Sequence, residues 1–178
     1  MSGLFSNAKI VNVDGLSEWD VSNVTTISNI FAGARQLKNV DGLEKWNTAN
    51  ITNMSYMFSE AEQLENVDGL SGWTTSKVQQ MVGIFKGTSV LSDFSGVSSW
   101  DTSKVINMSK AFYHSHISDL SYISGWDVSS VTNMSEMFYY AGNIASFASI
   151  NNWEPDSLEI TTDMFKGIPD TVPRPNWY

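Results

Sequence analysis

The stretch HSH holds the residues best suited to metal or acid–base chemistry. His114, His116 and Asp119 could hold a metal ion, but two side chains two residues apart point the same way only on a strand. Neither histidine lies in a motif that sets it beside a serine or an aspartate. The chain also lacks a glycine-rich phosphate loop, an H-E-x-x-H motif and any cysteine. We therefore expect no enzyme, no metal site and no cofactor.

A second set of candidate ligands follows six regularly spaced tryptophans. These residues are Asp20, Asn47, Thr74, Asp101, Asp127 and Glu154. Calcium takes about six to eight oxygen ligands, and a row with one carboxylate per repeat, interrupted by Asn47 and Thr74, does not supply them. Serine or threonine usually follows within two positions, and side chains of these types bond nearby backbone N–H groups. The sequence predicts that the row forms tight bends.

Four aromatic side chains form the main candidate binding site. The sequences FYHSHISDL and FYYAGNIAS align Tyr113 with Tyr139 and His114 with Tyr140, whereas the other repeats carry small or charged residues there. If strands set the pitch, neighbouring repeats lie about 5 Å apart and the rings form a two-by-two patch. Tyrosine-rich patches offer contact area at low entropic cost. We hypothesise a contact site; alternatively, the rings cover a gap left by a one-residue deletion in the fourth repeat.

An internal repeat of about 27 residues must position these side chains. Six tryptophans recur at intervals of 27, 27, 27, 26 and 27 residues, and a phenylalanine follows each one twelve positions later. The tryptophans are Trp19, Trp46, Trp73, Trp100, Trp126 and Trp153, and the phenylalanines are Phe31, Phe58, Phe85, Phe112, Phe138 and Phe165. We expect both sets to form ladders in the core, in preference to an exposed tryptophan row that binds sugars.

The apolar spacing within one copy predicts its local structure. Apolar residues recur at a spacing near three over residues 54–64, which favours a short helix or 3₁₀ turn there. We expect a short strand near residues 64–67 and a second extended piece near residues 49–52. Asparagines at one position of the repeat could also bond each other along the array. Neither element buries its apolar side alone, but stacked copies bury those of their neighbours.

The sequence therefore predicts an α/β repeat. The expected fold is a leucine-rich-repeat-like, right-handed solenoid of about seven coils, each with a short parallel strand and a short helical or 3₁₀ turn. Its parts are an N-terminal half repeat (1–18), a solenoid of six repeats (19–167) and a proline-rich C-terminal cap (168–178). Prolines stop regular pairing, and Trp177 and Tyr178 could cover the end of the core.

Composition narrows the class of partner. The net charge of −9 argues against nucleic acid, which requires a basic patch, and against attraction to an anionic membrane. No apolar run approaches the roughly 20 residues needed to span a bilayer. The N-terminus lacks a basic start followed by an apolar stretch, so no signal peptide is visible. We expect no nucleic-acid partner and no membrane insertion.

The strings WDTSKVINMSKAF, WDVSSVTNMSEMF and NVDGLSGW resemble the repeat of the BspA-like leucine-rich repeat surface proteins. The resemblance covers residues 11 to 167 approximately, although the cysteine that many family repeats carry after the phenylalanine is missing. It implies a solenoid at the cell surface that mediates adhesion by binding a protein or glycan ligand. Such repeats also occur in virus proteins, so the alternative is a virion surface or decoration protein whose partners are neighbouring subunits.

Overall fold

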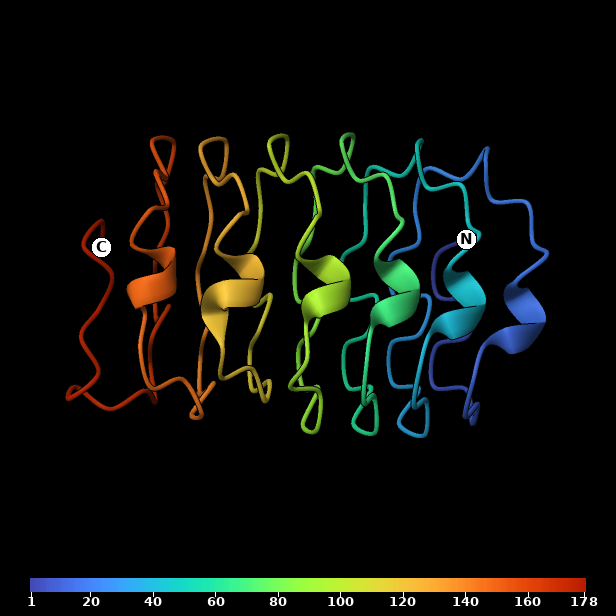
Figure 1. The fold of residues 1–178 in the computed structure, drawn as a ribbon, viewed down its shortest axis with the longest axis horizontal. Coiled ribbons are helices and arrows are strands. Elements are labelled where there is room, and N and C mark those ends of the chain that lie inside the picture. Colours follow the sequence, from blue (N-terminus) through green and yellow to red (C-terminus); the bar gives the residue numbers. More distant parts are fainter.

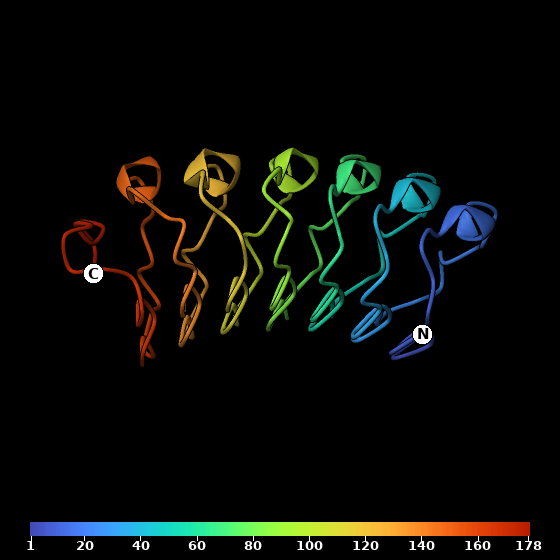
Figure 2. The ribbon, with the colours of Figure 1, turned by 90° about the horizontal axis from the view of Figure 1, so that it is seen from below.

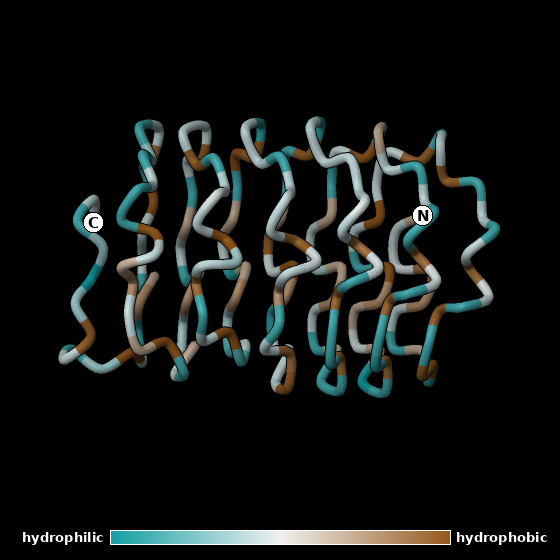
Figure 3. The backbone as a smooth tube through the Cα atoms, in the orientation of Figure 1, coloured by the Kyte–Doolittle hydropathy of each residue, from teal (hydrophilic) through white to brown (hydrophobic).

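Successive turns of the chain lie side by side along one axis (Figure 1). The computed structural model describes all 178 residues. Colours follow one another in sequence order from one end of the stack to the other, and apolar residues recur at equivalent places in successive coils (Figure 3). The regular elements are six 3₁₀ helices, η1 (Asp14–Leu16), η2 (Asp41–Leu43), η3 (Asp68–Leu70), η4 (Ser95–Val97), η5 (Leu120–Ile123) and η6 (Ala148–Ile150).

The 3₁₀ helices form a row on one face, and tight turns form a row on the opposite face (Figure 2). A close approach between coils explains the glycine at the middle of η2, η3 and η4. A Cβ atom on Gly42 or Gly69 would lie 2.2 Å from a backbone oxygen of the preceding coil, and one on Gly96 would lie 2.0 Å away. Any side chain there would force adjacent coils apart.

The expectation of a helical turn over residues 54–64 is wrong. This segment forms tight turns, and the 3₁₀ helix of the same coil is η3. Tyr56 and Glu60 have φ angles of 57° and 59°, which interrupt a right-handed helix. Their N–H groups donate to the next coil, to carbonyl oxygens of Val82 and Lys86, while Met57 donates within its own coil. The backbone thus bonds alternately to itself and to its neighbour.

No strand forms near residues 64–67 or 49–52. Neighbouring coils are joined instead by single parallel β-bridges, one residue per coil, through Thr26, Asn53, Gln80, Asn107, Asn133 and Ile160. The asparagines of this row do not bond each other along the stack. Each accepts from a backbone N–H two residues later in its own coil, as Asn53 does from Ser55 at 2.8 Å. The short asparagine side chain bonds the nearby backbone N–H of its own coil in preference to an asparagine of the next coil.

A continuous stack of phenylalanine rings runs through the core. It begins at Phe5 and includes the six phenylalanines of the full repeats, with centroids 5.7–5.9 Å apart and planes within 17° of parallel. All but Phe5 are at most 5% exposed. Because each ring is covered by its neighbours in sequence, a single coil could not bury its own phenylalanine.

The tryptophan column is less regular. Trp46, Trp73, Trp100 and Trp126 stack at 6.1–6.4 Å, and each donates its Nε1–H to a carbonyl oxygen of the preceding coil. Trp19 at the N-terminal end is 40% exposed and lies against Phe5. The tryptophans from Trp46 to Trp153 are 3–5% exposed, so they do not offer a row of ring faces to sugars.

The C-terminal segment continues the tryptophan column by one ring. Trp177 stacks on Trp153 at 5.9 Å and donates its Nε1–H to the carbonyl oxygen of Ile150 at 2.8 Å. The ring of Tyr178 meets Phe165 edge-on at 4.7 Å. These contacts close one side of the last coil without adding another coil.

Candidate functional site

The candidate aromatic patch begins with two residues that adopt left-handed backbone. His114 and Tyr140 have φ angles of 51° and 50°. Every coil has a positive φ at this position, and the other residues there are Asn7, Gly33, Glu60, Gly87 and Gly167. Large side chains rarely occupy this region, because their Cβ atoms crowd the backbone. The two aromatic residues therefore stand where three other coils use glycine.

The structure brings all four residues of the patch together. Tyr113 stacks on Tyr139 with centroids 4.6 Å apart and planes 4° from parallel, and His114 stacks on Tyr140 at 5.2 Å and 12°. The two stacks touch within each coil, at 4.7 Å for Tyr113 and His114 and 4.9 Å for Tyr139 and Tyr140. Tyr140 and His114 are exposed, whereas Tyr113 and Tyr139 are half-buried. The rings form one two-by-two cluster.

A lysine closes each end of the tyrosine stack. The Nζ atom of Lys86 lies 5.6 Å from the ring centroid of Tyr113, and that of Lys166 lies 5.4 Å from the ring of Tyr139. Such cation–π contacts are favourable. Lys86 also pairs with Glu60 at 2.7 Å, and Lys166 pairs with Asp163 at 3.0 Å. The hydrogen bond and charge of Asp163 raise the pKa of Lys166.

Gly167 supports the outer ring of the other stack. A Cβ atom on Gly167 would lie 2.6 Å from the Cγ and Cδ1 atoms of Tyr140, so the ring rests on the glycine backbone. Tyr140 is thus held between His114 and the last coil. The faces of three rings in the patch are covered, and only His114 has a face turned toward open space.

Two shallow hollows meet at His114. One, of about 380 Å³, is bordered by Glu60, Glu62, Gly87, Ser89, Tyr113 and His114. The other, of about 330 Å³, is bordered by Ser89, His114, Ser115, His116, Tyr140, Gly142 and Asn143. A ligand on the patch would therefore meet a ridge of ring edges with a depression on either side.

His116 has a separate structural role. Its backbone N–H donates to the carbonyl oxygen of Thr88 at 3.0 Å, and its Nδ1 lies 2.9 Å from the carbonyl oxygen of Ser89. These bonds hold the loop that the deletion shortens against the preceding coil. Asp119 instead accepts from the N–H of Ser121 at the start of η5. No group of three ligands suited to a metal ion forms.

The row of polar residues after the tryptophans makes tight bends. Asp20, Asp101 and Asp127 each accept from the backbone N–H of the serine two positions later, at 2.9–3.1 Å. The hydrogen bond from the serine side chain, followed by that from its N–H, lowers the pKa of each carboxyl group. Each carboxylate thus finds its hydrogen-bond donors within its own bend.

The 3₁₀ helices have three or four residues each, so none of them has the length or the apolar run that a membrane span needs.

A family model described as a Mycoplasma protein of unknown function, DUF285, matches residues 1–95 and again residues 90–171. The chain belongs to the DUF285 family. The two successive matches confirm that this DUF285 protein is a repeat protein. No curated protein matches the chain.

The sequence of this DUF285 protein predicted that the four rings lie in adjacent copies. It did not predict the left-handed backbone conformation of the residues that carry two of them, His114 and Tyr140. The left-handed residues are His114, Tyr140 and their equivalents, together with a second row at Gly3, Asn29, Tyr56, Gly83, Lys110, Glu136 and Asp163. Glycine at some positions of each row was the available signal, because glycine adopts positive φ without cost. The many other residues in the rows obscured it.

Proposed function

We propose that this DUF285 protein is a non-enzymatic recognition module that binds a protein partner through the aromatic cluster of Tyr113, His114, Tyr139 and Tyr140. The proposal includes a right-handed, leucine-rich-repeat-like solenoid of the BspA-like type, located at a cell surface. The single observation that carries it is the use of large rings at a left-handed position that three other coils fill with glycine. Backbone strain of about 1–3 kcal/mol persists where the surroundings or function require it.

Ring geometry favours a protein partner over a glycan. Stacking of a sugar needs free aromatic faces, but only His114 offers one, because both faces of Tyr113 and Tyr139 meet another ring or a lysine. Tyr140 lies between His114 and Gly167. The edges and hydroxyl groups remain for a partner, and tyrosine edges combine apolar area with hydrogen bonding, as in many protein interfaces.

The test replaces the cluster with residues that other coils already carry. A variant with Tyr113→Ser, His114→Gly and Tyr140→Gly copies Ser59, Gly87 and Gly167, so its coils should fold. The wild type and the variant would be applied to an array of extracellular matrix proteins and to a glycan array. We expect binding to a matrix protein that weakens about 30-fold or more in the variant, as expected for a hot spot.

A matched control keeps the charge and moves the change away from the cluster. Val11 is 49% exposed in the N-terminal half repeat, and Val11→Ala should leave binding unchanged. Equal binding by the triple variant and the wild type would refute the proposed site. Binding to glycans alone would refute the protein partner.

A second candidate function is a structural part of an assembly such as a virion surface, with neighbouring subunits as partners. The observation that favours it is the unpaired backbone at both ends of the stack.

A further inference from the structure

In the row of tight turns, the hydrogen bonds between coils run in one direction, whereas bonds elsewhere, such as that from the N–H of Thr52 to the carbonyl oxygen of Thr25, run the opposite way. In this row, three backbone N–H groups donate to carbonyl oxygens of the following coil at the first junction and four do so at each of the other five, at 2.7–3.1 Å. The donors of the first junction are Gly3, Phe5 and Asn7, and those of the last junction are Met134, Glu136, Phe138 and Tyr140. The row of tight turns therefore has a donor end and an acceptor end.

Both ends lack their partners. At the C-terminal end, the equivalent N–H groups of Asp163, Phe165 and Gly167 donate to no other group of the chain. At the N-terminal end, the equivalent carbonyl oxygens of residues 2, 4 and 6 accept from none. The two rows have the same two-residue spacing as the junctions inside the stack. Each row is one half of a junction, and the two halves are complementary.

The N-terminal end also lacks an apolar cover. Leu4 is 54% exposed, whereas its equivalents in the six full repeats are fully buried. These equivalents are Ile30, Met57, Ile84, Ala111, Met137 and Met164. Trp19 is 40% exposed at the same end. Leu4 and Trp19 thus present the surface that a preceding coil would cover.

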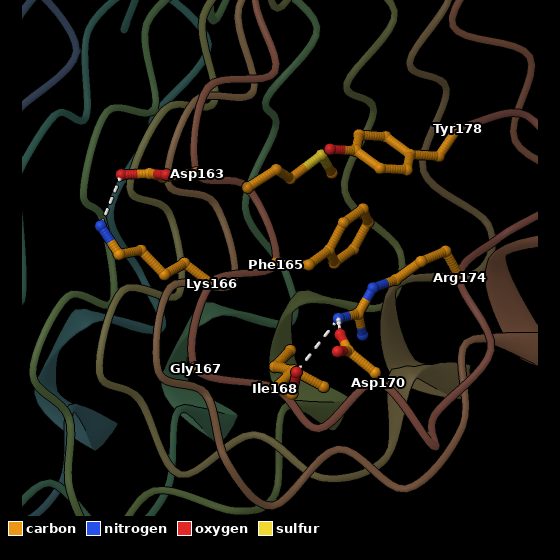
Figure 4. Close-up of a pocket in the computed structure, with 9 residues that line it drawn as sticks. Asp163, Phe165, Lys166, Gly167, Ile168, Asp170, Arg174 and Tyr178 are labelled. Carbon is orange, nitrogen blue, oxygen red and sulfur yellow. Dashed lines mark hydrogen bonds and ion pairs between the residues drawn. The ribbon is translucent and has the colours of Figure 1, made fainter.

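The C-terminal segment leaves the donor row accessible. Arg174 and Tyr178 contact the ring of Phe165 from one side, and a hollow of about 410 Å³ remains between them and residues 163–168 (Figure 4). In Figure 2 the segment curls beside the last coil, and the outer side of the row of tight turns stays open. An incoming backbone can reach the three N–H groups there.

We propose that the N-terminal end of a second copy docks on the C-terminal end of the first. Residues 1–8 of one copy would lie along residues 163–167 of the other and repeat the junction already formed inside the stack. This contact joins two different surfaces, so it leaves a free end on each product and produces linear chains. Because each copy carries a net charge of −9, added salt strengthens the contact by screening repulsion.

The first experiment measures the mass of the whole chain by sedimentation velocity across a concentration series. The wild type should rise above 19.8 kDa with concentration, and more steeply at high salt. Leu4→Lys should weaken association about tenfold or more, because the charge would be buried in the junction. Leu4 is exposed in the free chain, so folding should survive. Ile106→Lys makes the same charge change at a 42% exposed site in the middle of the stack and should associate normally.

Mixing the variant with wild type tests the direction of the contact. Leu4→Lys keeps an intact C-terminal end, so an excess of it should stop chain growth and give dimers with twice the 19.8 kDa mass. A wild type that stays monomeric at every concentration would overturn the proposal. So would normal association of Leu4→Lys, or a variant that leaves wild-type chains unshortened. None of these outcomes bears on the aromatic cluster.

Discussion

Gly167 offers a direct test of how the aromatic cluster is supported. Alanine at φ +84° costs about 1–2 kcal/mol of stability, since left-handed backbone crowds a Cβ atom. That Cβ would also lie 2.6 Å from the ring of Tyr140, so the ring must move and lose its stack with His114. An aromatic pair contributes about 0.5–1.5 kcal/mol, and half-exposure of Tyr140 reduces this to about 0.5–1 kcal/mol. The total loss is about 1.5–3 kcal/mol.

A double-mutant cycle separates the two costs. In a Tyr140→Gly background the ring is absent, so Gly167→Ala should cost only about 1–2 kcal/mol, the backbone part. The coupling of about 0.5–1 kcal/mol would be measured from urea unfolding midpoints. Thermal melts should agree, since about 1 kcal/mol shifts the melting temperature by about 2–4 °C in a chain of this size.

Gly125→Ala is the matched control, because a Cβ there meets nothing within 4 Å. It should change stability by less than about 0.5 kcal/mol. An equal cost of Gly167→Ala in both backgrounds would show that Tyr140 does not rest on Gly167.

Two further predictions concern the core and the bends. Trp73→Phe should lose about 1–3 kcal/mol, because the buried Nε1–H bond to the preceding coil disappears, whereas Trp19→Phe should lose much less in the same urea titration. Hydrogen bonds from Ser103 lower the pKa of Asp101, so their stabilisation is present above the unfolded pKa and is lost as pH falls through the folded pKa. Melting temperatures of wild type should therefore fall more between about pH 6 and about pH 2 than those of Asp101→Asn, and equal slopes would refute the assignment.

The sequence by itself determined which residues share a column. Intervals of 26 or 27 residues bring Phe31, Phe58 and their equivalents to the same place in each copy, and they align Tyr113 with Tyr139. Apolar side chains at those places cannot be buried within one copy, so the pattern already required neighbours. The bends after Trp100 and Trp126 follow from local side-chain bonds of Asp and Ser, which need no tertiary contact.

Only the tertiary structure decided how the backbone connects those columns. Alternate N–H groups leave the coil for its neighbour, and this requires positive φ at residues such as Tyr56 and Glu60 whose types favour a helix. The choice depends on groups about 27 residues away, which local propensity does not register. The same distant groups place His114 and Tyr140 on left-handed backbone and give the row of tight turns its direction. The unpaired N–H and carbonyl groups at its two ends follow from that direction.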